Sequence, residues 1–113
     1  MSRSQDKVDA AQKQLRTHGG KVAGFAADVR NAEATAAALK GAHDALGEFD
    51  VLISGAAGIF PAPALGMSSN AFKAVVDIDL LGTFNVLRHA HAYLRKPGAS
   101  IVNISAPQAE VAI

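Results

Sequence analysis

The 113-residue sequence contains no cysteine and no tryptophan, and aromatic residues make up only 5% of it. Without cysteine there is neither a disulfide framework nor a thiolate metal site, which suits a cytoplasmic protein. The scarcity of aromatic side chains disfavours the stacking platforms that bind single-stranded nucleic acid. No apolar run approaches the ~18 residues that cross a membrane, and the polar start MSRSQDKVDAAQ lacks the apolar core of a signal peptide.

Charge of one sign is also scarce. Eleven Lys and Arg residues stand against ten Asp and Glu residues, and the basic residues are scattered singly. The chain therefore offers no electrostatic basis for binding nucleic acid or an anionic membrane surface. A metal site is not expected either, because His89 and His91 diverge on a helix and His18 and His43 have no partner at ligand spacing.

What the sequence does have is apolar residues, which make up half of the chain. Helical periodicity, with glycine or polar residues at the ends, predicts helices over 7–20, 31–49 and 68–96. Asn31 and one of Ser68, Ser69 or Asn70 are expected to cap the last two helices. Short, nearly continuous apolar runs in 21–29, 50–58 and 97–106 predict strands that are buried on both faces. The alternation predicts a parallel sheet flanked by helices in one domain over residues 1–113, without an internal boundary.

Two aspartates interrupt the apolar stretch AVVDIDLLGTFNVL. Asp77 follows Lys73 by four residues, which favours an ion pair on a solvated surface. Asp79 is expected on the inward stripe of the helix with Val75, Val76, Thr83 and Val86, where an unpaired charge is costly. Asp79 is thus the candidate functional acid. The alternatives are that it bonds a neighbouring backbone group, or that the helix bends at Gly82 and admits water.

Four motifs occur in order: ADVRN after the first predicted strand, LISGAAG at the end of the second, DLLGTF in the long helix and GASIVNIS in the last strand. Together they resemble the short-chain dehydrogenase/reductase family. Within it, the stretches SGAAGIF, SSNAFKAVVDIDLLGTFNV and SIVNISA most resemble the 2,4-dienoyl-CoA reductases of the peroxisomal type and their bacterial relatives. The resemblance implies an α/β, partial Rossmann-type fold with three parallel strands, the third, fourth and fifth of the order 3-2-1-4-5-6. The first two strands and the C-terminal part of such a domain are absent.

The resemblance also implies a cofactor site. Ser2, Arg3 and Ser4 match the end of the second strand, where Arg3 would meet the ribose 2′-phosphate and favour NADP(H). Asp28 and Val29 match the pair that contacts the adenine. The family's NNAG turn corresponds to Gly55, Ala56, Ala57 and Gly58, whose small side chains let the backbone approach the nucleotide. If no cofactor binds, Arg3 is a disordered terminal charge, Asp28 is an ordinary turn residue, and residues 55–58 are a tight connection from strand to loop.

Two departures from the family pattern bear on the reaction. Asp79 replaces an asparagine, and Ala106 replaces the catalytic serine, which puts ordinary alcohol and ketone chemistry in doubt. The dienoyl-CoA reductases share both changes, and in them the acid positions a water that donates a proton while NADPH delivers hydride. Phe60, Ser68, Ser69 and Asn70 match positions near the acyl-CoA; structurally they are a loop hydrophobe and helix caps.

Two family motifs are missing, the glycine-rich G-x-x-x-G-x-G turn and Y-x-x-x-K. We therefore expect the isolated 113 residues to fold poorly or aggregate, and neither to bind NADPH tightly nor to turn over. The sequence is interpreted as the central segment of an NADP(H)-dependent 2,4-dienoyl-CoA reductase that forms a homo-oligomer, a tetramer, when full-length. The alternatives are a 3-oxoacyl or alcohol reductase of the same family, or a non-catalytic oligomerisation remnant that packs through the outer residues Leu80, Leu81 and Leu87.

Overall fold

The computed structural model describes residues 1–111. Its helices and strands are, in chain order, α1 (Gln5–Arg16), α2 (Ala32–Leu46), β1 (Val51–Ser54), α3 (Ser69–Val76), α4 (Gly82–Ala90) and β2 (Ser100–Asn103). A π-helical segment, η2 (Asp77–Leu81), joins α3 to α4. Three 3₁₀ turns complete the set: η1 (Ala64–Gly66), η3 (His91–Tyr93) and η4 (Pro107–Ala109). The predicted helices are therefore all present, with small shifts at their ends.

Polar caps define where two of the helices begin. The Asn31 side chain accepts a hydrogen bond from the Ala34 N–H at 3.0 Å, so α2 starts where the sequence predicted. Ser68 does the same for α3, accepting from the Ala71 N–H at 3.1 Å. Each cap satisfies one backbone donor that the first helical turn leaves without a partner.

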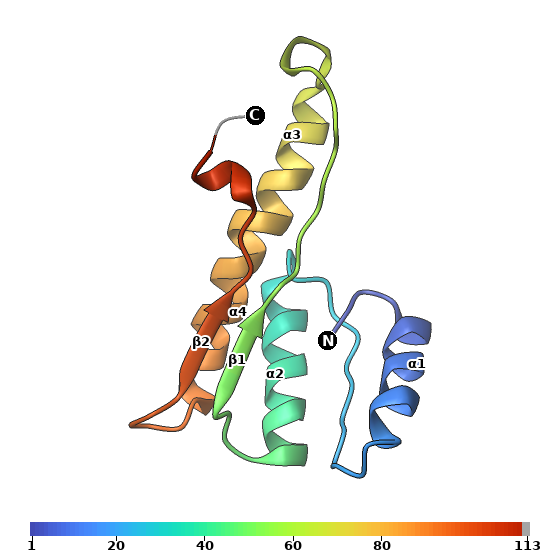
Figure 1. The fold of residues 1–113 in the computed structure, drawn as a ribbon, viewed down its shortest axis with the longest axis vertical. Helices are drawn as coiled ribbons and strands as arrows, with labels where there is room; N and C mark the ends of the chain where they lie inside the picture. Colours follow the sequence, from blue (N-terminus) through green and yellow to red (C-terminus); the bar gives the residue numbers. More distant parts are fainter. Residues whose placement is uncertain (112–113) are drawn as a thin grey trace.

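β1 and β2 form a two-stranded parallel sheet in which Val51 pairs with Ser100 and Ser54 with Asn103. The long helix, made of α3, η2 and α4, lies behind the sheet and runs roughly along its strands, and α2 lies beside β1 (Figure 1). Val29, Leu39, Leu52, Val86, Ala90 and Leu94 form the core between these elements. The helices cover only one face of the sheet, because Leu52 is buried whereas Val51 and Ile53 are 58% and 65% exposed.

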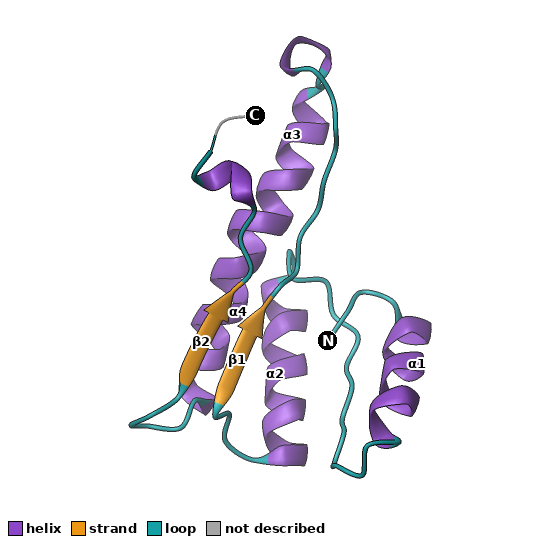
Figure 2. Cartoon of the chain, in the orientation of Figure 1, coloured by secondary structure: helices purple, strands orange, loops and turns teal. Residues whose placement is uncertain are grey.

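The predicted strand over 21–29 is not a strand of the sheet. This segment is drawn as a loop in Figure 2, and it makes one isolated parallel bridge, between Ala26 and Ser2. The Ala27 N–H donates to the Ser2 carbonyl oxygen at 2.8 Å. The prediction of three strands is thus wrong: among the described residues, the sheet has two strands. An apolar run forms a strand only where neighbouring backbone supplies hydrogen bonds, and here only one residue does so.

The long helix departs from regular α geometry in its middle, at η2. Within η2, Leu80 and Leu81 are exposed as expected for outward positions. The expectation for Leu87 is wrong, because this side chain is partly buried against the core. A π turn holds more residues than an α turn, so a strict 3.6-residue count across it assigns some side chains to the wrong face.

The chain is elongated, with principal extents of 48 × 34 × 27 Å and a Cα radius of gyration of 15.8 Å. A compact domain of ~100 residues has a radius of gyration of about 13 Å. The excess comes from α3 and the loop before it, which project beyond the sheet in Figure 1. No helix among residues 1–111 is long and apolar enough to span a membrane.

Candidate functional site

The ADVRN motif forms a tight turn that leads into α2. The Asn31 N–H donates to the Asp28 carbonyl oxygen at 2.9 Å, and the Arg30 N–H donates to Asp28 Oδ1 at 3.0 Å. The Arg30 guanidinium also donates hydrogen bonds to both carboxylate oxygens of Asp28, with Nη2 2.6 Å from Oδ2. This hydrogen-bonded pairing lowers the pKa of Asp28 from 3.8 to about 2. Asp28 is therefore ionised at neutral pH, and its charge is held within the turn.

The N-terminal residues lie beside this turn. Ser2 is bridged to Ala26, and the positive charge of Arg3 contributes to lowering the pKa of Asp28. The structure thus brings Ser2 and Arg3 to Asp28 and Val29, as the cofactor hypothesis requires. Ser4 has a different local role, because its Oγ accepts from the Lys7 N–H at 3.4 Å as the N-cap of α1.

The turn that follows β1 meets the π-helical segment of the long helix. Asp79 Oδ1 accepts a hydrogen bond from the Gly58 N–H at 2.7 Å. The backbone of Gly58 lies close to Ile78, because a Cβ at position 58 would be 2.6 Å from Ile78 Cδ1 and would require that methyl group to move. The bond joins residues that are 21 positions apart, and it places a carboxylate beside the turn that resembles the family's nucleotide-binding turn.

The structure corrects the expected burial of Asp79. Its side chain is exposed rather than turned into the core, whereas Asp77 is half-buried and forms the expected ion pair with Lys73. Asp79 stands at the centre of η2, where the wider turns invalidate an inward stripe counted at 3.6 residues per turn. Asp79 does bond a backbone group, the Gly58 N–H, and this contact is compatible with a structural role as well as with a catalytic one, so its role stays a prediction.

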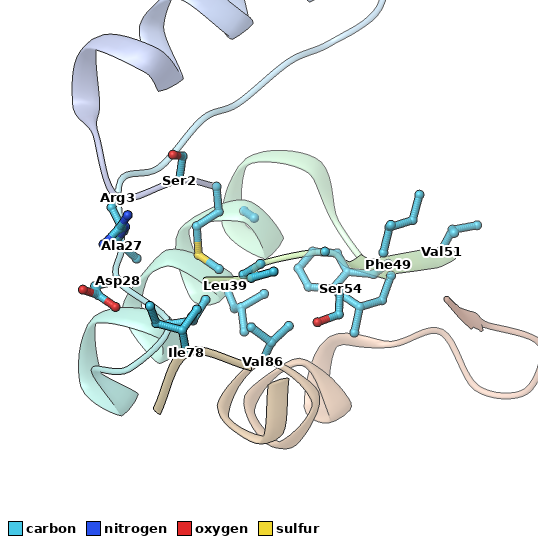
Figure 3. A pocket seen from close by; sticks show the side chains of 18 residues that line it. Ser2, Arg3, Ala27, Asp28, Leu39, Phe49, Val51, Ser54, Ile78 and Val86 are labelled. Carbon is cyan, nitrogen blue, oxygen red and sulfur yellow. The ribbon is translucent and has the colours of Figure 1, made fainter. Parts of the chain in front are cut away.

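Seven of the predicted cofactor residues line one cavity of about 690 Å³: Ser2, Arg3, Asp28, Val29, Gly55, Ala56 and Ala57. Figure 3 shows Ser2, Arg3 and Asp28 together at one end of the cavity, and Phe49 and Val51 at the other. One end is therefore polar and next to the ADVRN turn. The other is lined by apolar side chains of the sheet and the segment before it.

The residues expected near the substrate do not gather at this cavity. Ser68 caps α3, Ser69 and Asn70 are exposed in its first turn, and Phe60 is 55% exposed in the preceding loop. Asp79 follows Ser68 by eleven positions along the helix, or about 16 Å at an α-helical rise of 1.5 Å per residue. Ala106 is exposed and directly precedes η4.

Two residues at the site escaped the sequence analysis. Arg30 engages the carboxylate of Asp28, and its position two residues after an aspartate in a turn was an available signal. Asn85 is 4% exposed, and its Nδ2 donates to the Val29 carbonyl oxygen at 2.8 Å. A polar side chain next to the buried Val86 was the corresponding signal. Residues 1–111 contain no cluster of three His, Cys, Asp or Glu side chains that could hold a metal ion.

Comparison with known proteins decides the family. The short chain dehydrogenase family matches residues 1–113. The chain belongs to the short-chain dehydrogenase/reductase family of oxidoreductases. It is 45% identical over 108 residues to the peroxisomal 2,4-dienoyl-CoA reductase of Rattus norvegicus, covering 94% of this chain and 37% of the relative. It is 37% identical over 109 residues to the probable 2,4-dienoyl-CoA reductase of Bacillus subtilis, covering 95% and 43%.

The fold agrees with solved structures of this family. A double mutant of a Serratia marcescens short-chain dehydrogenase/reductase superposes with a TM-score of 0.89 at 23% identity, covering 100% of this chain and 46% of that one. The chain thus spans about two-fifths of the length of the relatives it matches. Because one of these relatives is named for the peroxisome, the cytoplasmic location stays a prediction.

Proposed function

We propose that the chain is the central part, over residues 1–113, of one NAD(P)-binding Rossmann domain in an NADP(H)-dependent oxidoreductase. Its substrate would be a 2,4-dienoyl-CoA thioester, whose conjugated double bond is reduced. The proposal rests on the contact between Asp79 and Gly58, which holds an exposed carboxylate at the nucleotide-binding turn. The similarity to reductases named for this substrate supports it.

The polar end of the cavity fits an adenosine nucleotide. Asp28 and Val29 would contact the adenine, and Arg3 would meet the 2′-phosphate that distinguishes NADP(H) from NAD(H). The turn Gly55–Gly58 would let the nucleotide approach the backbone closely. In the strand order 3-2-1-4-5-6, two further strands lie between segment 21–29 and β1. The apolar lining of the other end of the cavity, which includes Phe49 and Val51, supports the proposal that such strands pack there.

The reduced nicotinamide, when bound, would supply a hydride to the conjugated thioester. The proposed role of Asp79 is to position a proton donor next to the resulting dienolate. Its Oδ1 is held by Gly58, and among residues 1–111 no protein group donates to its Oδ2, which is free to accept from a water. That water would then give its proton to the dienolate carbon, and the hydroxide left behind would take up a proton from bulk solvent; this is general acid catalysis through a positioned water.

The proposed acyl-CoA site lies at the start of α3 and in the loop before it. There Phe60, Ser68, Ser69 and Asn70 would contact parts of the acyl-CoA other than the double bond that accepts the hydride. A homo-oligomer, a tetramer by analogy, is the proposed assembly. The exposed apolar side chains of the long helix support association, since Phe72, Leu80 and Phe84 are 62%, 70% and 57% exposed.

The deciding experiment follows NADPH oxidation by the full product of the gene with a 2,4-dienoyl-CoA as substrate. Asp79→Asn keeps an oxygen that accepts from Gly58 but removes the carboxylate, so kcat should fall by about 10²- to 10⁴-fold. Asp79→Ala should lose at least as much. The matched control, Asp77→Asn, breaks only the ion pair between the half-buried Asp77 and the exposed Lys73 and should leave kcat within about twofold.

Either alternative has its own signature in the same assay. A 3-oxoacyl or alcohol reductase would reduce ketones rather than the dienoyl thioester, and Ala106→Ser would increase that rate. A non-catalytic remnant would oligomerise without oxidising NADPH on any of these substrates. An Asp79→Asn variant with unchanged dienoyl reduction contradicts the proposed role of Asp79.

A further inference from the structure

Asn85 makes a contact that neither the core nor the proposed catalytic step requires. Its amide reaches across 56 positions of sequence to the carbonyl of Val29, and the bond is buried. Val29 is one of the two residues expected at the adenine. The carbonyl lies in a segment that has a single bridge to neighbouring backbone, so the Asn85 amide replaces a partner that a sheet would otherwise provide.

Two further contacts hold the same segment. Gly82 lies so close to Val29 that a Cβ at position 82 would be 2.5 Å from Val29 Cγ2. From the other side, the fully buried Thr35 directs its Oγ1 at the Asp28 carbonyl oxygen, 3.4 Å away. The Asp28–Val29 backbone is thus fixed between α2 and α4 by two side chains and one close approach.

We propose that Asn85 is a positioning residue for the nucleotide. Asn85 ties the Val29 backbone to the long helix, which also carries Asp79 and, through it, the Gly58 turn. The distance between the Asp28–Val29 segment and the Gly58 turn is thereby held constant. This role rests on the proposed function. A positioning residue of this kind governs cofactor affinity and leaves the chemical step unchanged, because it touches neither the substrate nor Asp79.

The test compares Asn85→Leu with the wild type in the full product of the gene. Leucine has a similar volume but donates no hydrogen bond, so it leaves the Val29 carbonyl without its partner. Hydrogen exchange of the Ala27 and Asn31 amides, which bond to Ser2 and Asp28, should become at least about fivefold faster without any cofactor. The KM for NADPH should rise about five- to tenfold with kcat within about twofold.

A second variant and a control keep the test decisive if Asn85→Leu does not fold. Gly82→Ala pushes on Val29 without touching the hydrogen bond, and it should raise the KM for NADPH as well. Leu94→Ala removes a side chain from the same core at a position nine residues after Asn85, and it removes none of the hydrogen bonds to Asp28 or Val29. It should lower the melting temperature without changing that KM.

The outcomes separate this inference from the proposed function. An unchanged KM for NADPH in folded Asn85→Leu and Gly82→Ala variants overturns the positioning role, while the wild-type activity still supports the proposed function. Equal changes in KM in the Leu94→Ala control also overturn it, because the effect is then one of general stability. A wild type that shows no NADPH binding contradicts both proposals, whatever the exchange rates.

Discussion

Asp28 and Arg30 stand two residues apart and form a bidentate ion pair inside a turn. Because the pair holds the pKa of Asp28 at about 2, below its unfolded value of 3.8, it contributes stability above pH 3.8. That contribution is lost as the pH falls from 3.8 through about 2, where the folded state also takes up the proton. The turn that carries Asp28 and Val29 is therefore predicted to loosen only in strong acid.

Replacing Arg30 with alanine tests this pairing. The pKa of Asp28 should return toward 3.8, since the largest cause of its lowering is the side-chain hydrogen bond from Arg30. The measurement is an NMR titration of the Asp28 carboxyl carbon in the full product of the gene. Lys40→Ala is the matched control, because Lys40 lowers the pKa of Asp44 instead. An Asp28 pKa that stays near 2 in Arg30→Ala contradicts the pairing.

The two aspartates of the long helix show what residue-scale reasoning can and cannot predict. The partner of Asp77 follows from a four-residue spacing within one helix, so Lys73 was predicted correctly. The partner of Asp79 lies 21 residues earlier, on another element, and no local pattern identifies Gly58. The catalytic role of Asp79 stays a prediction.

At the scale of elements, polar N-caps predicted the starts of α2 and α3 well, whereas the predicted glycine C-cap was wrong, because α1 ends at Arg16 with Thr17 as its C-cap. Asn31 and Ser68 begin α2 and α3 because a side-chain oxygen at that position satisfies a helical N–H. The π turn η2 was not predicted, because the stretch Asp77–Leu81 has no residue type that demands it. It arises where the long helix contacts both the Gly58 turn and Val29, at Asp79 and Gly82.

The cap of α2 gives a prediction for a whole element. Asn31→Ala removes the acceptor of the Ala34 N–H and should lower the free energy of unfolding by ~1 kcal/mol. Asn31→Asp keeps an acceptor and is the matched control, with a change of a few tenths of a kcal/mol at most. Urea denaturation of the full product of the gene measures both. Equal losses in the two variants would show that the side-chain hydrogen bond does not stabilise α2.

At the scale of the molecule, the chain leaves much apolar surface open. Val51, Ile53 and Ile104 are exposed around the sheet by 58%, 65% and 66%, and Leu80 and Phe84 are exposed on the long helix. Monomeric proteins rarely leave large apolar patches uncovered. The sheet itself has two strands, which is few for independent stability.

The isolated 113 residues should therefore unfold without a cooperative transition or associate in solution. Differential scanning calorimetry and light scattering at several concentrations measure the two behaviours. The Ile53→Thr variant of the same chain, which reduces the exposed apolar face, should scatter less light at equal concentration. A sharp, concentration-independent melting transition of a monomer, with micromolar NADPH binding, would overturn this prediction.

The sequence alone determined what depends on neighbours along the chain: the helices, their caps, the parallel α/β class and the family that the ordered motifs indicate. Only the tertiary structure decided which distant groups meet, namely Asp79 with Gly58 and Asn85 with Val29. It also decided that segment 21–29 makes a single bridge instead of a strand. The physical reason is that strand pairing and side-chain hydrogen bonds across the fold depend on the backbone that packing brings near, which spacing along one segment does not specify.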